Sequence, residues 1–177
     1  ISENKVLLLI GTKIQIKNLL KKTAEDCGLP YVSERWLGGT FTNLNTILKR
    51  TDYYKDLEKQ KEAGELDKYT KKERAKIDQE IKNLEIKFKG IKNLAKLPDA
   101  IFLCDMKKDQ LAVKEAKIKR IKVVGISDTN IDPTQADFPI PANDDAATSV
   151  GYILEKIKET ILKAKSEIKV IKPEITK

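Results

Sequence analysis

Histidine is absent from the 177-residue sequence. Its absence excludes acid–base catalysis by imidazole and every metal site that needs a histidine ligand. Cysteine occurs only at Cys27 and Cys104, which form no CxxC pair, so we expect two buried free thiols in a reducing compartment. No apolar run approaches the roughly 18 residues of a membrane-spanning helix, and no membrane segment is predicted. The sequence opens on Ile1 rather than on methionine, so we expect a segment of the natural chain to precede it.

Arginine is scarce although the chain is basic. Of 35 basic residues four are arginine and the rest are lysine, and the formal net charge is +8. A basic surface favours a polyanionic partner. Lysine offers a point charge rather than the bidentate fork with which arginine reads guanine, so we expect recognition of backbone and shape more than of base sequence.

Apolar runs alternate with amphipathic stretches over most of the chain. We predict strands at residues 5–10, 31–33, 100–104, 123–126 and 138–140, and helices at 13–27, 110–120 and from near Asp144 to Lys165. Continuous apolar strands linked by helices indicate an α/β fold, a doubly wound five-stranded parallel sheet of the flavodoxin or Rossmann type. The globular domain is predicted to comprise residues 1–47 and 91–165, and residues 166–177 a frayed tail.

The stretch between the second and third strands has a different pattern. Apolar residues recur at spacings of three and four on both sides of a polar reversal at Ala63-Gly64-Glu65. This pattern predicts an inserted antiparallel coiled-coil helical hairpin at residues 48–90. Basic and acidic residues are nearly balanced there, so most of these charges are expected to form a solvated face.

The most informative segment is YVSERWLGGTFTNLNTI, residues 31–47. Its two glycines predict a tight loop, flanked by Arg35 and the lone tryptophan, Trp36, and followed by short polar side chains. Such a set suits a phosphate backbone or an exposed base. The alternative is that Trp36 packs in the core and that Thr42 or Asn43 caps the next helix.

ERWLGGTFTN resembles the most distinctive segment of the bacterial-type small-subunit ribosomal protein number two, the S-two family. LLLIGTK, PDAIFLCDMKKDQLAVKEA and VVGISDTNIDPTQADFPIPANDDA resemble the same family in the same order. The resemblance implies the sheet order two-one-three-four-five, no enzymatic activity, and a cytoplasmic, ribosomal location. It also implies binding to small-subunit rRNA and to neighbouring ribosomal proteins, including the mRNA-binding protein S-one where that protein exists.

Charge is distributed unevenly along the chain. The first 50 residues hold twice as many basic as acidic residues, whereas residues 123–155 contain no lysine or arginine. We therefore expect a basic side that meets rRNA and an acidic side that faces solvent, bound Mg²⁺ or a basic protein. The rRNA-binding candidates are Lys13, Lys17, Arg35, Trp36, Asn43, Asn45, Lys49, Arg50, Lys107 and Lys108.

Two other functions remain open from the residues. One is a nucleotide- or Mg-binding α/β hydrolase that uses Gly11-Thr12-Lys13 as a phosphate cradle and Asp105, Asp128 and Asp132 as Mg²⁺ ligands. The chain has neither GxxxxGK[ST] nor GxGxxG, which disfavours it. The other is a coiled-coil adaptor that binds protein alone. No catalytic residue, cofactor or protein metal site is predicted, and a structural magnesium ion is considered only at an rRNA interface.

Overall fold

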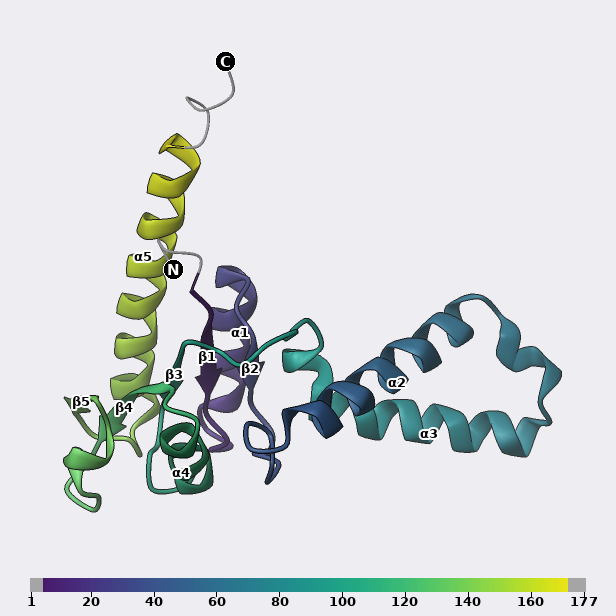
Figure 1. The fold of residues 1–177 in the computed structure, drawn as a ribbon, viewed down its shortest axis with the longest axis horizontal. Helices are drawn as coiled ribbons and strands as arrows, with labels where there is room; N and C mark the ends of the chain where they lie inside the picture. The colour runs from purple at the N-terminus through teal and green to yellow at the C-terminus, as the bar shows by residue number, and fades with distance from the viewer. Residues whose placement is uncertain (1–4, 172–177) are drawn as a thin grey trace.

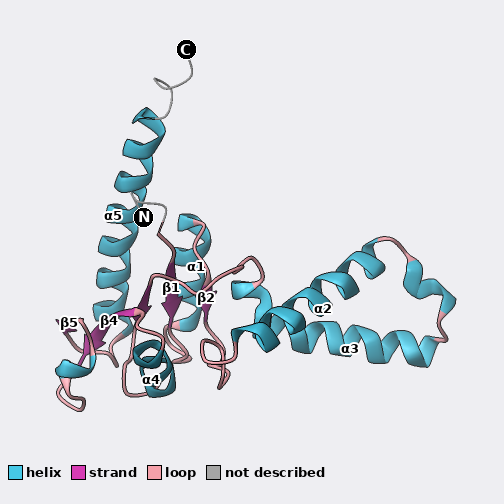
Figure 2. Ribbon diagram, in the orientation of Figure 1, coloured by secondary structure: helices cyan, strands magenta, loops and turns pink. Residues whose placement is uncertain are grey.

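The computed structural model describes residues 5–171 and contains one parallel sheet. The strands lie in the order β2-β1-β3-β4-β5, which confirms the order that the family resemblance implied. All four strand pairs are parallel, with Leu9 opposite Tyr31 on one side and Phe102 on the other. The strands are β1 (Leu7–Ile10), β2 (Tyr31–Val32), β3 (Ala100–Leu103), β4 (Lys122–Ser127) and β5 (Phe138–Pro141) (Figures 1 and 2).

Helices cover both faces of the sheet. On one face Leu9 and Phe102 pack with α1 (Lys17–Cys27) and α5 (Ala147–Ile171). On the other, Leu8 and Ile101 pack with α4 (Gln110–Ile118) and with the base of the inserted hairpin. Successive strand residues therefore enter opposite cores, which explains why β1 and β3 are apolar throughout.

The insertion is a helical hairpin that projects away from the sheet (Figure 1). Its elements are α2 (Leu44–Glu62), the short helix η1 (Glu65–Lys68), α3 (Lys71–Phe88) and the short helix η2 (Lys89–Ile91). The chain reverses at Gly64, whose φ of 71° suits glycine. Thr70 and Glu73 then form a reciprocal capping box that starts α3. The reversal thus lies where the sequence predicts it, whereas coiling of α2 around α3 stays a prediction.

Two helices begin later than predicted. α1 begins at Lys17 rather than Lys13, because the carbonyl of Lys13 accepts from the amides of Ile16 and Lys17 in a preceding turn. α5 begins at Ala147, since the side chain of Asn143 holds the next turn by accepting from the amides of Asp145 and Ala146. α5 continues to Ile171, beyond the predicted end at Lys165, and residues 172–177 of the predicted tail lie outside the described range.

The two edge strands are short and irregular. β2 contains two residues, and β5 carries Pro139 and Pro141, which have no backbone N–H. Between β4 and β5 the chain forms the short helix η3 (Pro133–Gln135). The remaining three strands form the middle of the sheet.

Candidate nucleic-acid interface

Lys13 lies in an acidic cluster at the carboxyl ends of the strands. Its Nζ lies 2.6 Å from Oδ2 of Asp105, and 2.8 Å from an oxygen of each of Asp144 and Asp145. The side chain of Lys13 is only 16% exposed. Lys13 thus neutralises carboxylates that follow β3 and β5, and its charge is engaged within the protein rather than presented to a partner.

The cluster shifts the pKa values of its members. Burial alone lowers the pKa of Lys13, but hydrogen bonds to Asp105, Asp144 and Asp145 outweigh burial and the pKa is raised. The pKa of Asp144 is raised, chiefly by burial. Asp144 is fully buried, and within the described residues its Oδ2 finds no hydrogen-bond partner. Lys13 therefore stays charged, whereas burial of the Asp144 carboxylate costs free energy of desolvation.

The three ligands considered for Mg²⁺ are not brought together. Asp105 pairs with Lys13, and Asp132 accepts hydrogen bonds from the amide and hydroxyl of Thr134 at the start of η3. Within residues 5–171, the carboxylates close enough to share a cation are Asp128, Asp144 and Asp145, with one oxygen of each inside 4.8 Å of the others. The sequence thus predicted one member of this group.

The Trp36–Thr42 loop is organised by Glu115, a residue of α4. One carboxylate oxygen accepts from the amide of Gly39 at 2.8 Å; the other accepts from the amides of Phe41 at 2.8 Å and Thr42 at 3.1 Å. Glu115 is 4% exposed. Burial raises its pKa, but these amides and the Trp36 indole outweigh burial, so the pKa is lowered. A buried charge therefore fixes the path of the loop into α2.

Trp36 is packed inside, as the alternative interpretation expects. It is 6% exposed, and its ring meets that of Phe41 edge-on with centroids 4.7 Å apart. Its indole N–H donates to Glu115 at 3.2 Å. Asn43 stands at the N-cap of α2, but its Oδ1 accepts from the hydroxyl of Thr46 rather than from a backbone amide. Trp36 therefore offers little surface to RNA.

The other candidates lie on the surface in two groups. Lys17, Arg35, Lys107 and Lys108 follow or flank strand ends, and Asn45, Lys49 and Arg50 lie in the first turns of α2. Lys17 pairs with Glu34 at 3.1 Å, and Nζ of Lys108 donates to the carbonyl of Thr12 at 3.2 Å. Among the candidates described within residues 5–171, five exposed side chains have no hydrogen bond or ion pair: those of Arg35, Asn45, Lys49, Arg50 and Lys107.

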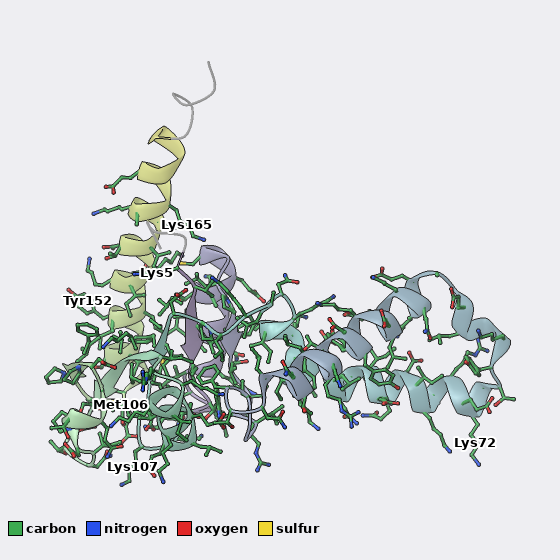
Figure 3. The ribbon with its side chains drawn as sticks, viewed as in Figure 1. Lys5, Lys72, Met106, Lys107, Tyr152 and Lys165 are labelled. Carbon is green, nitrogen blue, oxygen red and sulfur yellow. The ribbon has the colours of Figure 1, made fainter. Side chains whose placement is uncertain are left out.

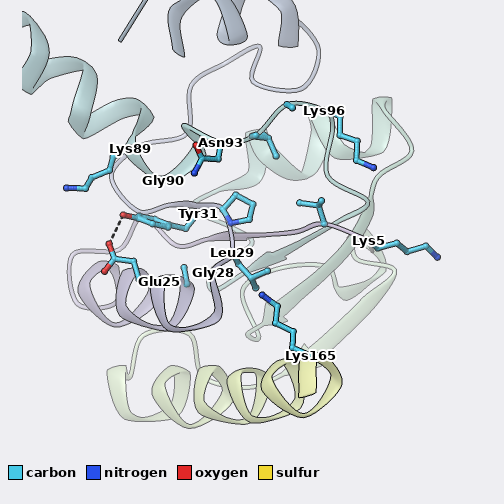
Figure 4. Close-up of a pocket in the computed structure, with 15 residues that line it drawn as sticks. Lys5, Glu25, Gly28, Leu29, Tyr31, Lys89, Gly90, Asn93, Lys96 and Lys165 are labelled. Atoms are coloured by element: carbon cyan, nitrogen blue, oxygen red, sulfur yellow. Dashed lines mark hydrogen bonds between the residues drawn. The ribbon is translucent and has the colours of Figure 1, made fainter. Parts of the chain in front are cut away.

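Figure 3 shows Lys107 at the end of the globular part where the strands finish, far from Lys72 near the hairpin tip. A hollow of about 900 Å³ lies at the other end of the sheet, between the amino ends of β1 and β2 and the segment after η2 (Figure 4). The hydroxyl of Tyr31 donates there to Glu25 at 3.2 Å. None of the sequence candidates lines this hollow. The exposed sequence candidates therefore lie at the strand ends and the hairpin base, away from this hollow.

Two features of α4 were not predicted from the sequence. Glu115 lies between apolar residues on the inward side of a predicted helix. This position could have indicated that its carboxylate has a structural role. Lys114 and Lys117 are one turn apart on the exposed side of the same helix, and helical spacing could have grouped them with Lys107 and Lys108.

A family model described as "Ribosomal protein S2" matches residues 1–164. The chain belongs to the ribosomal protein S2 family. Proteins named "Small ribosomal subunit protein uS2" are similar to it: that of Mycoplasmopsis synoviae is 42% identical over 160 residues, and that of Coprothermobacter proteolyticus is 40% identical over 163. These matches cover 90% and 92% of this chain but 54% and 61% of the two relatives, so this chain corresponds to part of their length. No helix within residues 5–171 has the length and apolar character to cross a membrane.

Proposed function

We propose that this S2-family chain is a structural, non-enzymatic constituent of the small ribosomal subunit that supports translation in the cytoplasm. It binds small-subunit rRNA and neighbouring ribosomal proteins. The observation that carries the proposal is the set of exposed, unpaired polar and cationic side chains at the hairpin base and strand ends: Arg35, Asn45, Lys49, Arg50 and Lys107. Contact with protein S-one, where present, rests on the family alone.

The candidates differ in whether their charges are already paired within the protein, so we assign them different roles. Lys49, Arg50 and Lys107 are free to contact phosphates, because no described residue neutralises them. Lys17 must first release Glu34, an exposed pair that costs little to break. Lys13 supports the strand-end loops from within, through Asp105 and Asp144. We include a structural magnesium ion between protein and rRNA, but no catalytic cofactor.

The test is titration of the purified chain onto small subunits depleted of their own copy, across a series of salt concentrations. Saturable one-to-one binding that weakens steeply with salt supports rRNA contact through phosphates. Arg50→Ala combined with Lys107→Ala should flatten the dependence of log K on log salt by up to about two units. Binding of nucleoside triphosphate without binding to subunits would overturn the proposal.

The projecting hairpin favours one other function, that of an adaptor that binds protein alone. Replacing residues 60–76 with a short glycine-serine linker removes the tip but keeps Tyr54 and Phe88, which are buried at the base. An rRNA-binding chain should then retain the contribution of its globular domain to subunit affinity. An adaptor should lose binding altogether.

A further inference from the structure

All exposed charges between Met106 and Ile121 are positive. They belong to Lys107, Lys108, Lys114, Lys117, Lys119 and Arg120, which we call the α4 cationic face. The two acids of this stretch are turned inward: Asp109 is 3% exposed and Glu115 is 4% exposed. Asp109 accepts from the hydroxyl and amide of Thr12, and Glu115 accepts from the loop amides. Neither acid is available to neutralise the surface.

The helix separates its charges by periodicity. Ala112, Val113, Glu115 and Ala116 are buried, whereas Lys114 and Lys117 lie one turn apart on the exposed side. Lys119 and Arg120 follow the helix end, where Arg120 has a φ of 56°. Lys107 and Lys108 precede the helix start. The cations therefore run along the outer side of α4 from one end to the other.

The protein neutralises these cations only in part, since hydrogen bonds from Thr134 and then the nearby charge of Lys117 lower the pKa of Asp132. Within residues 5–171, the side chains of the α4 cationic face form no hydrogen bond or ion pair, with the exception of Lys108, which donates to a backbone carbonyl. The hairpin differs, since Lys61 pairs with Asp78 and Lys89 with Glu85. What distinguishes the α4 cationic face is that its unpaired cations are gathered along one helix with no exposed acid between them.

Helix stability does not account for the cations at the amino end of α4. Positive side chains near a helix carboxyl end are stabilised by the macrodipole, which suits Lys117 and Lys119. The same dipole disfavours Lys107 and Lys108 before the first turn. A negatively charged partner would neutralise the cations at both ends of α4.

We propose that the α4 cationic face is an RNA-binding surface that holds a phosphate backbone, distinct from the hairpin base. This inference rests on the proposed function, since it assigns a second contact of the same chain with rRNA. Five of the six cations are lysine, which favours phosphate over base recognition. Leu111 and Ile118 are also exposed on α4, at 49% and 69%. They lie two turns apart, and a protein segment packed on them is the alternative that the third variant below distinguishes.

The test compares two charge-reversal variants in the same subunit titration. Lys114→Glu with Lys117→Glu should weaken binding at least tenfold and lower the salt slope by about two units. The matched control is Lys22→Glu with Lys163→Glu on α1 and α5, exposed lysines that have no hydrogen bond or ion pair within residues 5–171. The control makes the same change in net charge and should stay within about threefold of the unmodified chain. Circular dichroism and melting curves check that all variants fold.

A third variant identifies the class of partner. Leu111→Ser with Ile118→Ser should bind almost as well as the unmodified chain if the partner is RNA, and a photo-crosslinker at position 114 should yield a protein–RNA product. Greater loss from this variant than from charge reversal, or a crosslink to protein, would overturn the inference. Equal binding by the charge-reversal variant and its control would also overturn the inference. In that case, subunit binding by the unmodified chain would still support the proposed function. If the unmodified chain does not bind subunits, both proposals fail.

Discussion

The indole nitrogen of Trp36 lies 3.2 Å from Oε1 of Glu115, across 79 residues of sequence. The same carboxylate accepts from three backbone amides of the loop, so a helix on one face of the sheet determines how the chain enters the hairpin. Glu115, which is distant in sequence, therefore helps to determine the conformation of the loop together with the loop's own glycines.

Replacing Glu115 by glutamine should lower the free energy of unfolding by about 1–3 kcal/mol. Glutamine keeps the shape, but it replaces one acceptor oxygen with a donor that faces the loop amides. Urea denaturation measures the effect. The matched control is Glu155→Gln on α5, an exposed residue, where little change is expected. A loss no larger than that of the control would show that the carboxylate is not needed for the loop.

The contribution of Glu115 should depend on pH. Its pKa in the folded protein is lowered from the ordinary value of 4.5, since the loop amides outweigh burial. The carboxylate therefore stabilises the fold fully above the unfolded pKa, and this stabilisation is lost as pH falls through the folded pKa. The stability difference between the unmodified chain and Glu115→Gln should be constant near neutral pH and shrink below about pH 4.5. A difference that grows on acidification would contradict this assignment.

Lys13→Met should destabilise the protein by about 3 kcal/mol at neutral pH, because Asp105 and Asp144 would be left buried without a cation. Without the lysine the pKa of Asp144, already raised by burial, should rise further, so lowering the pH should restore part of the stability. Lys17→Met is the control; it breaks the exposed pair with Glu34 and should cost less than about 1 kcal/mol. Thermal melts at two pH values measure both variants, and equal losses would contradict a structural role for Lys13.

Gly90→Ala should destabilise the fold by about 3 kcal/mol or more. A Cβ at this position would lie 2.1 Å from the carbonyl oxygen of Tyr31 and 2.7 Å from its ring, so η2 could no longer pass this close to β2. Gly38→Ala is the control, because its added Cβ would meet its nearest neighbour, Leu111, at 3.6 Å, an ordinary contact. Chemical denaturation of both variants should separate them clearly. Similar stabilities would show that the hairpin base shifts to accommodate a methyl group.

Local patterns predicted the elements well, because each strand and helix has its own apolar periodicity. The short runs before Gly11 and after Pro98 became β1 and β3, and the order of the sheet followed from the family resemblance. Helix starts were less accurate because they depend on single hydrogen bonds, such as those accepted by Asn143. The local sequence pattern does not predict those hydrogen bonds.

The candidate site was harder to predict because its decisive contacts are long-range. Lys13 meets Asp144 across 131 residues, and no local signal separates such a lysine from one that is free to contact phosphate. Leu66 at the hairpin tip is likewise buried, although polar residues surround it in the sequence. The exposed lysines of α4 could have been grouped by helical spacing, whereas the inward role of Glu115 required the fold.

The prolines of β5 and the brevity of β2 affect how the chain behaves before it reaches a partner. An open sheet edge recruits strands from other molecules through unpaired N–H groups. β5 lacks two of these groups, at Pro139 and Pro141, and β2 offers only two residues. Neither edge is a good template for a further strand, so newly made molecules should resist edge-to-edge aggregation even at high concentration.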